Sequence, residues 1–160
     1  MNVWNRDGQA LMVVPMRVAG RVSGCQIIDE HGQKKFLAGS KTSGATFAMG
    51  KGLNVLCEGY ATGLTVHEAL RRLRVSACVH VCFSAGNMLK ISIGLKRGIV
   101  IADNDASGTG QKVADQIGWP YWMSDKTGED CNDFMIRASL FNLTQQLRKV
   151  LHSQNQLDTG

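Results

Sequence analysis

The 160-residue sequence has few of the residues and segments that mark specialised classes of protein. Only two prolines stand against 18 glycines, which favours regular elements joined by tight glycine-containing turns over proline-rich linkers. No stretch approaches the roughly 18 consecutive apolar residues that a membrane-spanning helix needs. No charged-then-apolar signal segment opens the chain. We therefore expect a soluble intracellular protein with no membrane partner.

The five cysteines are odd in number and include no CxxC pair. This set predicts neither a disulfide framework nor a closed zinc site, and it fits a reduced cytoplasm. Cys78 and Cys82 lie in one apolar run, where burial in a strand is the expected role.

Charge is distributed unevenly along a chain whose net charge is +5. Residues 1–56 carry seven lysines and arginines against three acids, whereas residues 96–160 carry seven against eight. A basic first third and an acid-bearing last third suit a site where cations bind a polyanion and carboxylates bind a metal. Ordinary solvated strand and helix faces would give the same distribution.

The hydrophobic pattern changes its period near residue 52. Residues 10–49 form short strand-like runs separated by turn residues, which predicts a small antiparallel β subdomain. Beyond it, apolar strands alternate with amphipathic helices, which predicts an α/β fold with a mostly parallel four-stranded sheet flanked by helices. The expected strands are residues 53–57, 77–83, 98–103 and 120–123, and the expected helices are residues 62–73, 88–95, 107–117 and 132–152. We divide the chain into a basic β subdomain (1–52), an α/β domain (53–152) and a frayed tail (153–160).

Acidic residues follow three of the predicted strands. Glu58 comes after the first strand, Asp103 and Asp105 after the third, and Asp130 and Asp133 after the fourth. The carboxyl ends of parallel strands meet at one edge of a sheet, so these side chains can converge. Carboxylates without a histidine or cysteine cluster suit Mg²⁺ or Mn²⁺ better than zinc.

Each acidic cluster also has a structural interpretation. Asp105 could cap the helix that follows it, and Asp130 and Asp133 could stabilise a helix dipole. Glu58 could simply end a strand before a turn. Three such clusters at three strand ends favour a shared site over three separate structural roles.

Three segments of the chain closely resemble the motifs of the Toprim domain, which bacterial-type primases, type IA and type II topoisomerases and some nucleases share. They are residues 57–63 (CEGYATG), 100–108 (VIADNDASG) and 128–133 (GEDCND). The β-rich residues 13–43 resemble the segment that precedes Toprim in primase catalytic cores, and residues 84–87 (SAGN) resemble a loop of plasmid and phage primases. The resemblance covers residues 53 to about 135, with the β segment favouring a primase.

The resemblance implies a Toprim (Rossmann-like) fold and a DNA primase core in a bacterial cytoplasm. Such a core joins ribonucleoside triphosphates on a single-stranded DNA template, using Mg²⁺ or Mn²⁺. Glu58 would be the acid/base residue. Asp103 and Asp105 would be the principal metal ligands, and Asp130 or Asp133 would complete the set.

The resemblance also implies contacts with the nucleic acid and the nucleotide. Template or triphosphate phosphates would meet a group of basic residues, namely Lys34, Lys35, Lys41 and, less strongly, Arg17. Gly59 and Gly108 would permit close approach of the backbone. A solvated hairpin is the structural interpretation of the lysines. A replicative helicase is a possible further partner.

The sequence departs from the family pattern at some points, and it leaves rival functions open. The chain has no Cys/His pattern for the zinc domain of many primases, and Ala106 stands where replicative primases often carry arginine. We therefore expect a minimal core, either part of a larger mobile-element primase or a short phage or plasmid protein. The rivals are a Toprim nuclease, a non-catalytic DNA-binding module, and, more distantly, a receiver-like or phosphatase domain.

Overall fold

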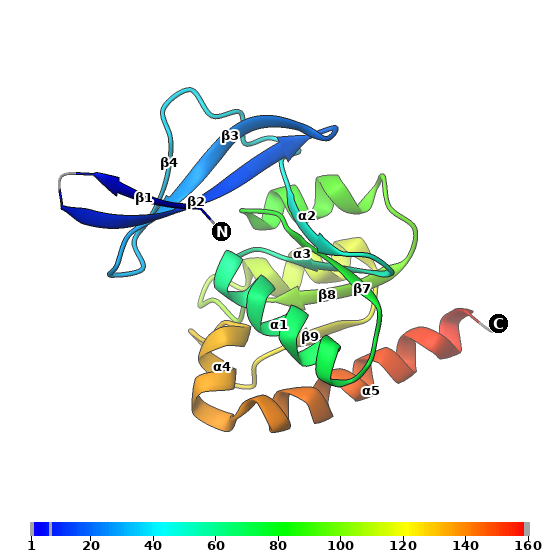
Figure 1. Cartoon of the computed structure of the whole chain (residues 1–160). Helices are drawn as coiled ribbons and strands as arrows, with labels where there is room; N and C mark the ends of the chain where they lie inside the picture. Colours follow the sequence, from blue (N-terminus) through cyan, green and yellow to red (C-terminus); the bar gives the residue numbers. More distant parts are fainter. Residues whose placement is uncertain (1, 7, 159–160) are drawn as a thin grey trace. The chain divides into compact units, whose positions relative to one another are not determined.

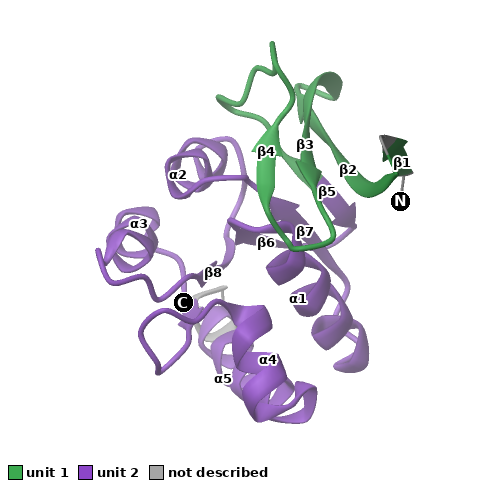
Figure 2. Cartoon of the chain, turned by 90° about the vertical axis from the view of Figure 1, so that its left-hand side faces the viewer, with its two compact units in different colours: residues 1–47 green, residues 48–160 purple. Residues whose placement is uncertain are grey.

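The computed structural model describes residues 2–6 and 8–158 (Figure 1). The chain divides into two compact units, residues 1–47 and 48–160 (Figure 2). Within these described residues the fold is α/β, with two sheets and five helices. None of the helices in the described residues is both long enough and apolar enough to cross a membrane.

The first unit contains a four-stranded antiparallel sheet in the order β1-β2-β3-β4. Its strands are β1 (Asn2–Arg6), β2 (Gln9–Val18), β3 (Arg21–Ile28) and β4 (Lys34–Phe36). A two-residue turn joins β2 to β3, and both of its residues have a positive φ, 48° at Ala19 and 78° at Gly20. That geometry matches the twist of a tight hairpin. The buried residues Val14, Met16 and Ile28 lie on one face of this sheet, which is its apolar side.

The second unit is built on a five-stranded sheet in the order β5-β7-β6-β8-β9. The strands are β5 (Phe47–Gly50), β6 (Leu53–Cys57), β7 (Ala77–Val81), β8 (Gly98–Ala102) and β9 (Tyr121–Met123). The last four are parallel to one another, as the apolar runs predict. The fifth strand, β5, was expected in the β subdomain, but it forms the edge of this sheet.

Helices cover both faces of the second sheet (Figure 2). They are α1 (Tyr60–Arg72), α2 (Ala85–Ser92), α3 (Thr109–Ile117), α4 (Cys131–Ala138) and α5 (Leu140–Asp158). Helices α2 and α3 pack together, as do α1, α4 and α5. A buried cluster that includes Leu56, Met88, Val100 and Ala114 joins α2 and α3 to strands β6 and β8.

The single long helix expected over residues 132–152 is two helices. Ser139 lies between α4 and α5 with a φ of 88° and a ψ of 153°, which interrupts the helical path. Its N–H still bonds to the carbonyl of Met135, and its hydroxyl accepts the N–H of Asn142 in the first turn of α5. Both helices contact α1, so the apolar pattern continues across the break and does not reveal it. Helix α5 runs to Asp158, beyond the expected end at residue 152, and residues 159–160 lie outside the described residues.

Gly98 provides a test of how closely β8 packs in this sheet. A Cβ at this position would lie 2.1 Å from the carbonyl oxygen of Asn54 and 2.8 Å from the ring of Trp119. We expect Gly98→Ala to lower the free energy of unfolding by about 1–3 kcal/mol through overpacking. The matched control is Gly94→Ala, since a Cβ there meets only one atom, at 3.8 Å. Urea denaturation of both variants measures the difference, and equal stabilities would contradict the close packing.

Candidate active site at the carboxyl ends of the strands

Three of the predicted acidic residues line one cavity of about 570 Å³ in the second unit. Glu58, Asp103 and Asp105 are half-buried there. The remaining wall comes from the starts of two helices, at residues 84–86 and at Ser107 and Thr109. The convergence predicted from the strand ends is therefore present for these three carboxylates.

Hydrogen bonds beyond the strands hold the Glu58 side of the cavity. The N–H of Phe83 bonds to the carbonyl of Glu58 at 2.9 Å, which continues the pairing of β6 with β7. Phe83 then has a φ of 66°, a left-handed conformation that costs a bulky residue on the order of 1–2 kcal/mol. Ser84 follows as the N-cap of α2 and accepts the N–H of Asn87 at 3.2 Å. Strain of this kind, held by the surrounding structure, is common at functional sites.

The beginnings of two helices contribute to the cavity wall. Ala85 and Gly86 are the first residues of α2, and Thr109 is the first residue of α3. Unpaired N–H groups and the positive end of the helix dipole make such positions favourable for anions. The cavity therefore combines carboxylates, which attract cations, with backbone donors, which suit phosphate oxygens.

Asp105 is engaged by the start of α3. Its Oδ1 accepts the N–H of Ser107 at 2.8 Å and of Thr109 at 3.2 Å, and its Oδ2 accepts the N–H of Gly110 at 2.9 Å. The hydroxyl of Ser107 also donates to Oδ1. These bonds hold the pKa of Asp105 well below its ordinary value, and the bond from the Ser107 hydroxyl has the largest effect. Asp105 therefore caps α3, as the structural interpretation of this residue predicted. A metal ion bound to its carboxylate would share the carboxylate oxygens with the N–H groups at the start of α3.

Backbone contacts fix Asp103 and the loop around it. A Cβ at Gly110 would lie 2.1 Å from the carbonyl oxygen of Asp103, so only glycine lets α3 begin this close. Asn104, between the two aspartates, donates its N–H to the carbonyl of Glu129 at 3.2 Å and accepts the N–H of Gly128 at 2.6 Å. Its side-chain amide donates to the carbonyl of Ser124 at 3.0 Å. Asn104 thus ties the Asp103–Asp105 loop to the loop before α4, a role that the sequence analysis missed.

Asp130 and Asp133 form the capping box of α4 instead of lining the cavity. Oδ1 of Asp130 accepts the N–H of Asp133 at 2.9 Å, and Oδ2 of Asp133 accepts the N–H of Asp130 at 3.3 Å. The structural role that the sequence also allowed for this pair, at the start of a helix, is the role observed. Completion of a metal site by either residue stays a prediction.

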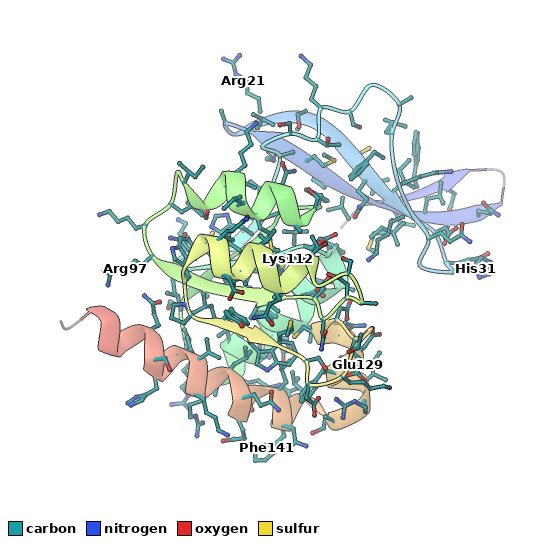
Figure 3. The ribbon with its side chains drawn as sticks, turned by 180° about the vertical axis from the view of Figure 1, so that it is seen from behind. Arg21, His31, Arg97, Lys112, Glu129 and Phe141 are labelled. Carbon is teal, nitrogen blue, oxygen red and sulfur yellow. The ribbon has the colours of Figure 1, made fainter. Side chains whose placement is uncertain are left out.

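Glu129, which neighbours this pair, is the buried carboxylate that the sequence analysis overlooked (Figure 3). Its oxygens accept two hydrogen bonds from Arg137, at 2.7 and 2.9 Å, and one from the Ser124 hydroxyl at 2.7 Å. The hydrogen bonds from Arg137, and to a smaller extent that from Ser124, lower the pKa of Glu129 to about 2. They outweigh the desolvation by burial, which raises this pKa. Only its place beside Asp130 in the 128–133 motif could have drawn attention to it.

The cavity has hard oxygen donors, but they are not gathered into a preformed cage. Within residues 2–6 and 8–158, no three His, Cys, Asp or Glu side chains are grouped so that they could hold a metal ion. Mg²⁺ commonly binds through one or two carboxylates, with water and substrate phosphates as its other ligands. Glu58 and Asp103 fit that requirement, with Asp105 beside them.

Three cysteines close to these acidic residues are fully buried, namely Cys57, Cys82 and Cys131. Burial raises the pKa of all three thiols, that of Cys82 to about 12. The charges of Asp103 and Asp130 raise the pKa of Cys57 further. Neutral thiols are poor nucleophiles, so these three cysteines are not candidate nucleophiles.

The predicted phosphate-binding residues lie in the first unit, where Arg17, Lys34, Lys35 and Lys41 are all exposed. Arg17 donates to the carbonyl of Gly20 at 3.1 Å, within its own hairpin.

The two predicted glycines lie in the second unit, each as the N-cap of a helix. Gly59, before α1, has an extended backbone. Gly108, before α3, has a φ of 69°, and a Cβ there would meet nothing within 4 Å. Its left-handed conformation is therefore what favours glycine at this position.

The buried Glu129 carboxylate predicts a pH-dependent stability difference. Its pKa is lowered on folding, so its stabilisation is complete above the unfolded value near 4.5 and is lost as the pH falls towards 2. We expect Glu129→Gln to unfold at lower urea concentration than the unmodified protein at pH 7, with the gap narrowing below pH 4.5. Glu30→Gln, at an exposed position, serves as the control. A gap that is constant from pH 7 to pH 3 would show that the ionised carboxylate is not what stabilises the loop.

Comparison with known proteins gives this chain no family. No protein-family model matches it. No curated protein matches it either.

Proposed function

We propose that this chain is a Toprim-type DNA primase core that joins ribonucleotides on a single-stranded DNA template. The observation that carries the proposal is the convergence of Glu58, Asp103 and Asp105 on one cavity beside two helix starts. The Toprim-like motifs supply these residues from the ends of β6 and β8, which are parallel neighbours in the sheet. The β-rich unit that precedes them favours a primase over the other Toprim enzymes.

Glu58 is the proposed general base of the reaction. It accepts the proton of the primer 3′-hydroxyl, whose oxygen then forms a bond to the α-phosphorus of the incoming nucleotide. The bond from that phosphorus to the bridging oxygen breaks, and pyrophosphate leaves. The half-buried position of Glu58 in the cavity wall supports this role.

Asp103, with Asp105, is the proposed holder of Mg²⁺ or Mn²⁺. When bound, such an ion neutralises phosphate charge and favours ionisation of the attacking hydroxyl. Oδ1 of Asp103 is buried, and the backbone carbonyl of the same residue lies against Gly110, so the backbone that carries this carboxylate has a fixed position. The N–H groups at the start of α2 would bind phosphate oxygens.

The first unit is the proposed contact with the DNA template. Lys34, Lys35, Lys41 and Arg17 are exposed cations in a unit whose sequence has few acids. Cations that neutralise phosphates release counterions and give salt-dependent affinity. A replicative helicase as partner and a bacterial cytoplasm as location complete the proposal.

The capped acidic residues support a second candidate, a non-catalytic DNA-binding module. Asp105, Asp130 and Asp133 all bond to helix N–H groups, which gives each of them a structural role. A module of this kind would bind DNA through its basic residues and would need no metal. A Toprim nuclease would use the same carboxylates with water as the nucleophile.

Glu58→Gln tests the primase directly. The protein is incubated with single-stranded DNA, labelled ribonucleotides and Mg²⁺ or Mn²⁺, and both new oligonucleotides and template loss are followed on one gel. We expect short products whose yield falls at least about 100-fold in the variant, because the amide cannot accept the proton. Glu68→Gln, on the exposed face of α1 where Glu68 pairs with Arg71 and Arg72, is the matched control.

The other outcomes of this assay identify the rivals. Template cutting without synthesis would assign the chain to the nucleases. DNA binding without either reaction would favour the binding module. Synthesis that survives in Glu58→Gln would remove Glu58 from the mechanism.

Asp103→Asn tests the metal. We expect the affinity for Mn²⁺, measured by electron paramagnetic resonance of the unbound ion, to fall at least about tenfold when this ligand loses its charge. Glu68→Gln again provides the comparison, as a carboxylate outside the cavity. An unchanged Mn²⁺ titration would remove Asp103 from the ligands.

A further inference from the structure

A second cavity, of about 580 Å³, lies in the same unit at the opposite end of the sheet from the acidic one. The end of α3, the residues that lead into β9, and one side of α5 form its walls. Figure 3 shows β9 running between these two helices. We call it the α3–α5 cavity. Its volume is within the range of pockets that bind small molecules.

Aromatic residues with fixed positions line the α3–α5 cavity. The ring of Trp119 lies over Gly98, where even a Cβ would come within 2.8 Å of it. Trp119 and Tyr121 are both half-buried and pack against the core cluster of β6 and β8. A rigid aromatic wall of this kind suits the flat face of a ring-containing ligand.

One wall of the cavity is electronegative. Asp115 lies on α3 near the end of the helix, whose last carbonyls carry the negative end of its dipole. The amide nitrogen of Gln111 is 3.5 Å from both oxygens of Asp115 and also donates to the Tyr121 hydroxyl. Asp115 is therefore placed to accept a hydrogen bond from a donor in the cavity.

The opposite wall, on α5, carries the cation Lys149. Asp115 and Lys149 line the same cavity, yet neither forms an ion pair with any described residue. A ligand that spans the cavity can therefore meet both charges. It needs a hydrogen-bond donor at one end, an anion at the other and a planar body between them.

We propose that the α3–α5 cavity binds a nucleoside phosphate whose base carries an exocyclic amine. The base lies against Trp119, its amine donates to Asp115, and its phosphate lies beside Lys149. This site contains no cluster of carboxylates, so its occupation needs no divalent ion. It is separate from the acidic cavity and does not depend on the primase reaction.

The test follows the indole N–H signals of a ¹⁵N-labelled sample by NMR while adenosine monophosphate is added in the presence of a chelator. The chain has three tryptophans, and Trp119→Phe identifies the signal of Trp119. We expect the Trp119 signal to shift and saturate. The Trp122 signal provides an internal control, because that residue is buried and its N–H bonds to Gln146 at 2.6 Å.

Ligand and protein variants then test each contact. We expect adenosine, which lacks the phosphate, and purine riboside monophosphate, which lacks the amine, each to bind about tenfold more weakly. Lys149→Gln should abolish the preference for adenosine monophosphate over adenosine, and Asp115→Ala, which removes the acceptor, should abolish the preference for the amine. Arg148→Gln is the matched control, since Arg148 is the neighbouring cation on α5 but lines a different pocket.

Four results would overturn the proposal. The first is a Trp119 signal that does not move at millimolar nucleotide, and the second is an unchanged preference of Lys149→Gln for adenosine monophosphate over adenosine. The third is binding of free phenylalanine as tight as that of the nucleotide. The fourth is a shift of the Trp119 signal that disappears in Glu58→Gln. The last would show that the nucleotide occupies the acidic cavity instead. The same shift in Glu58→Gln and in the unmodified protein supports a separate site, whatever the outcome of the primase assay.

Discussion

The position of β6 between β7 and β8 is the constraint on which the acidic cavity depends. Cys57, the last residue of β6, is in register with Val81 on one side and Ile101 on the other. The chain segments that leave these three strands therefore begin at one level. That register places Glu58, Ser84 and Asp103 around the same space, although long stretches of sequence separate them.

In this unit, acidic side chains are paired with backbone and side-chain hydrogen-bond donors. Asp105 and Asp130 accept N–H groups at the starts of α3 and α4, and Glu129 accepts Arg137 in a buried position. Asn104 connects the two systems by bonding to the loop that carries Glu129. Because each loop is fixed by the next, these carboxylates have defined positions, and charge preorganised in this way would suit the proposed phosphoryl transfer.

The parallel strands of the second unit and the convergence of Glu58, Asp103 and Asp105 were predictable from the sequence. Apolar runs that alternate with amphipathic helices specify such a sheet, and the carboxyl ends of its strands meet by geometry alone. The interruption at Ser139 was not predictable, because the helices on both sides of it contact α1 and keep one apolar pattern. The burial of Glu129 was hidden for a similar reason, since its partner Arg137 lies on the helix that follows and nothing in the sequence marks the pair.

The sequence by itself determined the alternation of parallel strands and helices after residue 52 and the residues at the strand ends, because these depend on local periodicity. The tertiary structure decided which acids share a cavity and which cap helices. It left Asp103 and Glu58 on the cavity wall, and it directed Asp130 and Asp133 to the N–H groups of α4. The α3–α5 cavity was also decided at that level, since it unites residues of α3, β9 and α5. The physical reason is that a carboxylate is satisfied by the nearest well-placed donor, and folding alone brings those donors within reach.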